Sequence, residues 1–379
     1  MSVARHLLYV SDVVPGPGYG GCIIVDRHLR HLAAEGWTLT VVSPFGQTAA
    51  PGPWREIRLP ARRWLWPPFR PAQTMLAAFR ARMWRRELAR ADVLRADAIV
   101  TVCWGSMSWL AAALATAWHT PLVAIVHDWW GEKGTNEDAL IGRHACVVAK
   151  KVFAVSAEMQ AVLTIECARD IDVLYPIPAS RTLPFAVWRN QFSAPALAHV
   201  GSLHPYHEEF LATVATRLAA LGGRLLLLCP RDNPIADALS RRCTNVVRQD
   251  AFPDNADAVR WTAAHASALV VMYRHGLDAT GRPPTGFPSR LVEFAQLGLP
   301  VLLAAPAANP IRTWADRHNW TAQLDPDDGD TVDRLLAALT RPADWKRLAA
   351  ETRAAAESDF DPLRLHAQFS TTLQRLVSV

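Results

Sequence analysis

The sequence predicts an α/β protein made of two doubly wound, Rossmann-like domains. Its 379 residues suffice for two domains of ordinary size. Half of the residues are apolar and a fifth are charged, which is the composition of a globular protein. Short apolar runs alternate with amphipathic segments along the chain, as they do where helical crossovers join parallel strands.

The first half of the chain alternates predicted strands with predicted helices. Its apolar and β-branched runs predict strands over residues 6–10, 38–43, 98–104, 122–127 and 151–155. The segments between them predict helices over residues 22–34, 107–118 and 157–165. This alternation implies right-handed βαβ crossovers and a parallel sheet.

One part of this series contains no Asp, Glu, Lys or Arg from residue 98 to residue 126, which is long enough to cross a membrane. Gly105, His119 and Pro121 divide it into a strand, a helix and a strand. Parallel strands are covered on both faces and therefore read as continuous apolar runs. We expect a buried βαβ unit here rather than a membrane span.

The second half repeats the pattern. Strands are predicted over residues 197–200, 224–229, 245–247, 268–272 and 301–304, and helices over residues 208–220, 256–265 and 289–297. Pro176, Pro178 and Pro184 mark a linker between the two series. We expect domains over residues 1–180 and 181–360, and a C-terminal helix over residues 361–379 that packs back toward the first domain.

Charge and cysteine usage limit the class of protein. The net charge is +5, and residues 1–190 carry 21 Lys and Arg against 15 Asp and Glu. Six cysteines are scattered without a CxxC pair, which indicates reduced thiols rather than a disulfide framework or a zinc site. The first ten residues lack the apolar run of a signal peptide. We expect a cytoplasmic protein.

A glycine-rich loop follows the first predicted strand. Gly16, Gly18 and Gly21 formally match GxGxxG, so a nicotinamide or flavin dinucleotide is one interpretation. The glycines lie far from the strand end, and the second strand ends at Ser43 without the acidic residue that would hold a ribose. A cradle of backbone amides from Gly18, Gly20 and Gly21 for a phosphate or a sugar is favoured, with a plain structural turn as the alternative.

The second motif lies within residues 281–301. Ser289 is a predicted N-cap, Glu293 follows about one turn later, and Gly298 ends the helix before the last strand. The helix N-terminus would face a diphosphate, and Glu293 would accept hydrogen bonds from the adjoining ribose. The alternative is a solvent-facing glutamate on an amphipathic helix.

This segment resembles the donor-binding signature of GT-B glycosyltransferases, in particular the family-4-like, retaining-type group. Glu293 matches the glutamate that contacts the nucleotide ribose in that family, and Gly298, Pro300 and Val301 match the end of the motif. Phe287 matches its aromatic residue, whereas Thr285 replaces the glutamate that faces the donor sugar. The resemblance implies two Rossmann-like domains that face each other across a cleft.

Further residues extend the resemblance. Gly201 and Ser202 match the loop that opens the donor domain, although Ser202 and His207 stand where the family has basic residues. Other cations would then neutralise the diphosphate, for which Arg is well suited. The donor-binding residues that we expect are Gly201, Ser202, Arg274, Arg282, Thr285, Gly286, Phe287, Ser289, Arg290 and Glu293.

Three residues are candidates for catalysis. His127 and Asp128 follow an apolar strand, and the resemblance places a strand-end histidine near the sugar. If the reaction inverts the anomeric centre, Asp128 is a candidate base for the acceptor hydroxyl, with Asp12 as its rival. If it retains the configuration, His127 would hydrogen-bond the sugar or the phosphate. A satisfied structural histidine is the alternative for His127.

Residues 54–95 combine many arginines with aromatic residues. Arginine and tryptophan together suit the headgroup region of an anionic membrane, although a solvated helix or a nucleic-acid surface has the same composition. Membrane-bound, polyprenyl-linked acceptors of GT-B enzymes would fit the first reading. The membrane-facing residues that we expect are Arg62, Arg63, Trp64, Trp66, Trp84 and Arg85.

Together these features predict a glycosyltransferase that moves a sugar from a nucleoside-diphosphate donor to a saccharide or polyprenyl-linked acceptor, at the inner face of the plasma membrane, in polysaccharide biosynthesis. We expect no metal, no cofactor besides the donor and no nucleic-acid partner. The alternatives are a non-catalytic, membrane-associated nucleotide-sugar-binding protein and a nicotinamide-dependent oxidoreductase.

Overall fold

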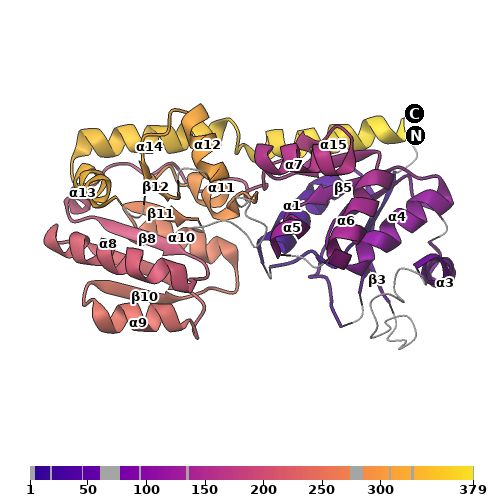
Figure 1. Ribbon diagram of the computed structural model, residues 1–379, viewed down its shortest axis with the longest axis horizontal. Coiled ribbons are helices and arrows are strands. Elements are labelled where there is room, and N and C mark those ends of the chain that lie inside the picture. The colour runs from indigo at the N-terminus through magenta and orange to yellow at the C-terminus, as the bar shows by residue number, and fades with distance from the viewer. Residues whose placement is uncertain are drawn as a thin grey trace. The chain divides into compact units, whose positions relative to one another are not determined.

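Two parallel β-sheets organise the chain (Figure 1). The computed structural model describes residues 5–17, 19–44, 46–59, 77–93, 95–133, 136–273, 285–306, 309–325 and 328–378. The chain divides into two units, of which unit 1 comprises Met1–Pro176 with Leu363–Val379 and unit 2 comprises Ile177–Pro362. The C-terminal segment thus belongs to unit 1.

The described part of unit 1 contains a seven-stranded sheet in the order β3-β2-β1-β4-β5-β6-β7, with every neighbouring pair parallel. The strands are β1 His6–Val10, β2 Thr38–Ser43, β3 Arg55–Arg58, β4 Ala98–Val102, β5 Leu122–Val126, β6 Lys151–Ala154 and β7 Asp172–Val173. Strands β4 and β5 are buried along their whole length, which explains their uninterrupted apolar sequence.

The helices of unit 1 connect these strands. They are α1 Gly20–Ala34, α3 Ala77–Arg90, α4 Ser106–Trp118, α5 Trp130–Lys133, α6 Asn136–Val148, α7 Ala157–Cys167 and α15 Pro362–Val377. The uncharged stretch forms β4, α4 and β5 as predicted, and no helix in the described ranges is both long and apolar enough to cross a membrane. Helix α15, yellow in Figure 1, packs on α1 and beside β7.

The described part of unit 2 contains a six-stranded parallel sheet in the order β10-β9-β8-β11-β12-β13. The strands are β8 Ala196–Val200, β9 Arg224–Cys229, β10 Val246–Asp250, β11 Ala268–Met272, β12 Val301–Ala304 and β13 Gln323–Leu324. The helices are α8 Glu208–Ala220, α9 Pro234–Arg242, α10 Asn255–His265, α11 Ser289–Ala295, α12 Pro310–Arg317, α13 Gly329–Ala338 and α14 Pro342–Glu357.

Side-chain caps explain several helix starts in unit 2. Asn233, Asp254, Asn309 and Asp328 each accept hydrogen bonds from backbone amides of the first turn that follows. Such caps satisfy amides that would otherwise lack a partner. In α11 the prediction was wrong, because Pro288 occupies the N-cap and Ser289 is the first helical residue.

Both sheets have a point where the strand order reverses direction. In unit 1 the chain adds β2 and β3 on one side of β1 and then β4 on the other side of β1. In unit 2 it adds β9 and β10 on one side of β8 and then β11 on the other side. Ligands of doubly wound folds bind outside the carboxyl ends of the strands at such points. The loops after β1, β4, β8 and β11 are therefore the candidate ligand-binding positions.

Candidate functional site

The candidate site of unit 1 lies where β1 and β4 end. The Asp12 carboxylate follows β1 and accepts a hydrogen bond from Met107 N, at 2.8 Å, in the first turn of α4. Gly105 precedes this helix with φ +68°, and a Cβ at Gly105 would collide with the Asp12 carboxylate. Both the backbone conformation and the close approach therefore require glycine here. The Asp12 carboxylate thereby stabilises the N-terminus of α4.

A second pair of contacts fixes the loop after β1. Ser11 Oγ donates to Val102 O at 3.1 Å and accepts from Val13 N at 3.0 Å. The Tyr9 hydroxyl donates to Val13 O at 2.5 Å from within the core. These bonds tie the end of β1 to the end of β4 and fix the backbone on both sides of Asp12.

His127 follows β5 at the same edge of the sheet. Its Nδ1 is buried and has no hydrogen-bond partner among the described residues. Burial lowers the pKa of the imidazole to about 4, and the Asp128 carboxylate partly opposes this shift. His127 is thus neutral at physiological pH and can act as a hydrogen-bond donor or acceptor.

The first turn of α1 packs against this histidine. Gly20 and Gly21 are the first two residues of α1, and Tyr19 is its N-cap. A Cβ at Gly21 would lie 3.2 Å from His127 Nδ1 and 3.1 Å from the Tyr19 ring, so glycine leaves room for both side chains. The structure therefore joins the glycine loop to His127, whereas Gly18 lies outside the described residues.

Tyr19 is a site residue that the sequence reasoning missed. Its side chain is more than half exposed at the start of α1. Partial burial raises the pKa of its hydroxyl, and electrostatic interactions with Cys22, Asp128 and Asp12 add to the effect. The phenol thus interacts electrostatically with both candidate carboxylates. Its position before a helix that begins with two glycines was the available signal.

The candidate site of unit 2 centres on Arg290, in the first turn of α11. Arg290 Nη1 donates to Val200 O and to His199 Nε2, each at 3.1 Å. A Cβ at Gly201, which has φ +107°, would be in van der Waals contact with this side chain. Arg290 thus lies over the loop that follows β8, and the structure brings two predicted donor-binding residues, Gly201 and Arg290, together.

The charged guanidinium of Arg290 is partly buried. Burial lowers the pKa of the guanidinium, and interactions with Tyr206 and Tyr273 oppose this change. An arginine nevertheless stays protonated in proteins. Within the described residues no carboxylate forms an ion pair with it, so its charge is available to an anionic ligand.

Glu293 lies one turn further along α11 and is 8% exposed, which excludes the solvent-facing alternative. Its Oε1 accepts from Asn255 Nδ2 at 2.7 Å, and its Oε2 accepts from Ala179 N at 3.3 Å. The two bonds fix the orientation of the carboxylate. Asn255 was missed in the sequence, because nothing in a separation of 38 residues indicates that the two side chains meet.

The loop before α11 is held from two sides. The Tyr273 hydroxyl donates to Gly286 O at 2.5 Å, and Thr285 is buried. Phe287 is also buried and packs edge-on against Trp314, with ring centroids 5.8 Å apart. Phe287 therefore anchors the loop in the core. Ser202, by contrast, is exposed after β8.

The remaining predicted site residues divide into those outside the described residues and those on α3. Arg274 and Arg282 lie outside the described residues, as do Arg62, Arg63, Trp64 and Trp66. Trp84, which was expected to face a membrane, is only 3% exposed. This prediction was wrong because Trp84 and Leu88 lie four residues apart on one buried face of α3. Arg85 is exposed.

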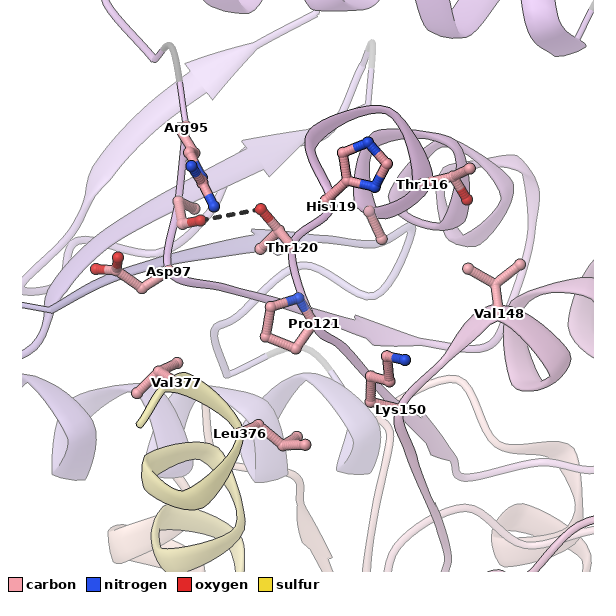
Figure 2. A pocket seen from close by; sticks show the side chains of 12 residues that line it. Arg95, Asp97, Thr116, His119, Thr120, Pro121, Val148, Lys150, Leu376 and Val377 are labelled. Atoms are coloured by element: carbon pink, nitrogen blue, oxygen red, sulfur yellow. Dashed lines mark hydrogen bonds between the residues drawn. The ribbon is translucent and has the colours of Figure 1, made fainter. Parts of the chain in front are cut away.

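Unit 1 also has a pocket of about 800 Å³ at the opposite edge of its sheet. It lies before β4, β5 and β6, where Arg95, His119 and Lys150 line it (Figure 2). Leu376 and Val377 of α15 also line it, on the side away from Arg95 and His119 (Figure 2). None of the predicted site residues lines this pocket. Among the described residues no cluster of His, Cys, Asp and Glu is placed to hold a metal ion.

Comparisons with known proteins bear on the function. A family model described as Glycosyltransferase Family 4 matches residues 20–176. No curated protein matches the chain. A solved glycosyltransferase from Rickettsia africae is 12% identical, with a TM-score of 0.70 over 100% of this chain and 99% of that chain.

Two further solved structures are similar along their whole length. Anabaena HepE, solved in complex with UDP, is 14% identical, with a TM-score of 0.69 over 98% of this chain and 100% of that chain. WaaG, a glycosyltransferase involved in lipopolysaccharide biosynthesis, is 14% identical, with a TM-score of 0.63 over 97% of this chain and 99% of that chain.

At these identities the structural likenesses show the fold, and they confirm the predicted α/β, GT-B class. The match of residues 20–176 confirms the family-4-like resemblance and leaves the oxidoreductase alternative without support. The chain is thus a glycosyltransferase of GT-B fold, and its residues 20–176 match the Glycosyltransferase Family 4 model.

Proposed function

We propose that unit 2 binds a nucleoside-diphosphate sugar through Arg290 and Glu293. The observation that carries the proposal is Arg290, a confined guanidinium without a described carboxylate partner, at the point where the strand order of this sheet reverses. A guanidinium binds phosphate oxygens in a bidentate geometry. Because α11 has only seven residues, Arg290 rather than the helix dipole would neutralise most of the diphosphate charge.

Glu293 would recognise the nucleoside. Asn255 and Ala179 hold its carboxylate in one orientation, three residues after Arg290. A fixed carboxylate accepts two hydrogen bonds from a ribose diol at little entropic cost. UDP is the first nucleotide to test, since the similar Anabaena structure was solved with UDP.

Unit 1 would bind the acceptor and supply the reacting groups. His127 and Asp128 follow β5 at the carboxyl edge of its sheet, where Gly21 of α1 lies against the His127 ring. We propose His127 and Asp128 as the catalytic residues. Asp12, which caps α4, is instead a positioning residue for the loop that carries it.

The stabilisation of the departing diphosphate by arginine would make the reaction independent of a bound metal. A chelator should then leave the rate of transfer unchanged. A rate that falls with chelator and returns with added Mg²⁺ or Mn²⁺ would contradict this part of the proposal.

The acceptor would be a saccharide on a polyprenyl carrier, at the cytoplasmic face of the plasma membrane, for polysaccharide biosynthesis. Arg82, Arg85, Arg86 and Arg90 are exposed on α3, and of these only Arg90 has a described ion-pair partner. Such a basic face is attracted to anionic lipid headgroups. α3 packs against α4 through its opposite, apolar face.

Isothermal titration calorimetry of the purified chain with UDP, GDP and NAD tests the donor site. We expect one nucleoside diphosphate to bind and NAD not to bind. Arg290→Ala should weaken the binding, whereas Arg242→Ala, which removes an exposed arginine of the same unit, should leave it unchanged. Equal affinity of the wild-type protein and Arg290→Ala would contradict the proposal.

A further inference from the structure

A row of hydrogen-bonded polar side chains connects α15 to α1 inside unit 1. Its members are Ser370, Glu35, His366 and His28. His366 of α15 is buried, and its Nε2 lies 2.9 Å from Glu35 Oε1, directly after α1. The Ser370 hydroxyl donates to the other oxygen of Glu35. His366 Nδ1 lies 3.3 Å from Nδ1 of His28, a buried residue of α1.

The chemistry of these groups fixes the direction of the hydrogen bonds. A carboxylate only accepts, so His366 Nε2 carries a proton. Burial lowers the pKa of both histidines, so they are neutral. His366 Nδ1 is then an acceptor, and His28 Nδ1 must be the donor to it. Nε2 of His28 is left as an acceptor.

The buried nitrogens without a partner among the described residues include His28 Nε2 and His127 Nδ1. A buried acceptor without a donor is costly, and so is a buried donor without an acceptor. A donor at His127 Nδ1 would satisfy both nitrogens.

His28 lies on the face of α1 against which His127, the residue after β5, is packed at Gly21. His127 Nδ1 faces the helix at Gly21, where a Cβ would lie 3.2 Å away. His28 lies two turns later on the same face, about 10 Å along the axis. Helical side chains lean toward the N-terminus, which brings His28 nearer to Gly21. His28 and His127 also interact electrostatically.

We propose that His366 and His28 are positioning residues that hold His127 in its Nδ1-protonated tautomer, with one buried water between His28 Nε2 and His127 Nδ1. A water can bridge polar groups that lie beyond direct hydrogen-bond distance. His127 Nε2 is then unprotonated and carries a lone pair. It accepts a hydrogen bond from a hydroxyl and does not donate to a phosphate oxygen.

This inference rests on the proposed function only for the identity of that hydroxyl, which belongs to the donor sugar or the acceptor. The tautomer itself is a property of the protein without substrate. Its measurement therefore succeeds or fails independently of any transferase assay.

The experiment uses full-length protein labelled with ¹⁵N-histidine, at pH 7 and without ligand. Long-range ¹H–¹⁵N correlation spectra show which ring nitrogen carries the proton, and loss of a signal in His127→Gln assigns it. We expect His127 to be protonated at Nδ1. In His28→Leu and in His366→Leu the proton should move to Nε2 in a large fraction of molecules.

His31→Leu is the matched control, since His31 stacks on His366 at 4.7 Å but has no place in the row. It should leave the tautomer unchanged. His366 lies at the far end of the row, so a change caused by His366→Leu is not a local packing effect. Protonation of wild-type His127 at Nε2, or an unchanged tautomer in His366→Leu, would overturn the proposal. If a variant fails to fold, the spectrum of the wild-type protein still shows whether His127 is protonated at Nδ1 or at Nε2.

Discussion

Asn255 donates to Glu293 through a hydrogen bond of 2.7 Å that joins the first residue of α10 to the middle of α11. The bond fixes the orientation of the Glu293 carboxylate. Only 8% of this residue is exposed. A carboxylate held in this way is prepared for a ligand before the ligand arrives, which reduces the entropic cost of binding.

Removal of the carboxylate should therefore weaken donor binding. Hydrogen bonds to a charged group contribute about 1.5–3 kcal/mol, so Glu293→Ala should raise the Kd for the nucleoside diphosphate at least tenfold. Asn255→Ala should raise it less, because the carboxylate remains but loses its orientation. Calorimetry measures both, with Glu209→Ala as the control for an exposed glutamate of the same unit. An unchanged Kd in Glu293→Ala would remove this residue from the site.

Gly21 should be essential for activity rather than for folding. Gly21→Ala would place a methyl group 3.2 Å from His127 Nδ1 and 3.1 Å from the Tyr19 ring. Both side chains would have to shift, so the rate of transfer should fall about 100-fold, as it does when a reacting group is misplaced.

Gly36→Ala gives the contrasting result, because Gly36 has φ +89° and nothing lies near its Cβ. This variant should lower the unfolding free energy by about 1 kcal/mol through backbone strain and leave the rate unchanged. Thermal unfolding and initial rates distinguish the two glycines. Equal activity of Gly21→Ala and wild type would show that the first turn of α1 does not form part of the site.

The strands show how far sequence reasoning reaches. Residues 6–10, 38–43, 224–229, 268–272 and 301–304 form strands at the predicted boundaries, because each is an apolar run between turn-forming residues. Strand β3 was missed, because Arg55–Arg58 is a charged edge strand without an apolar pattern. Helix α14 was missed as well.

The site shows the same limit more sharply. Residues near a strand end, such as His127 and Asp12, could be proposed as site residues because parallel strands share one carboxyl edge. The contact between His28 and His366 was not predicted, since 338 residues separate them and no local pattern indicates such a contact. Trp84 was misassigned because composition was considered without the helical period that buries it with Leu88.

The stability of the protein should fall in mild acid. Burial lowers the pKa of His127 to about 4 and that of His28 well below its usual range, whereas both titrate near 6.5 in the unfolded chain. The unfolded state therefore binds more protons, and the unfolding free energy decreases as the pH falls from about 6.5 toward 4.

Denaturant unfolding between pH 4.5 and 7.5 measures this dependence. His127→Gln should make it shallower, by up to one proton taken up on unfolding. His265→Gln, which changes an exposed histidine of α10, should leave the slope as it is in the wild type. An identical slope in His127→Gln would contradict the burial of a neutral His127.

Membrane association should depend on α3. Each basic residue near an anionic surface contributes about 1 kcal/mol. Replacement of Arg82, Arg85 and Arg86 by Ser should therefore lower the binding to vesicles that contain phosphatidylglycerol by about 100-fold. Replacement of the exposed Arg231, Arg241 and Arg242 of unit 2 is the matched control for the loss of three positive charges. Equal vesicle binding by both triple variants would show that α3 is not the membrane-facing surface.

The most direct test of the central claim is transfer itself. The wild-type protein is incubated with radiolabelled nucleotide sugars and a lipid extract that contains polyprenyl-linked acceptors, and labelled lipid product is counted. We expect product from one nucleotide sugar, with loss of product in His127→Ala and in Glu293→Ala. If a nucleotide sugar binds to unit 2 but no label is transferred to lipid or to a soluble saccharide, the protein is a non-catalytic binding protein and the proposed transfer reaction is contradicted.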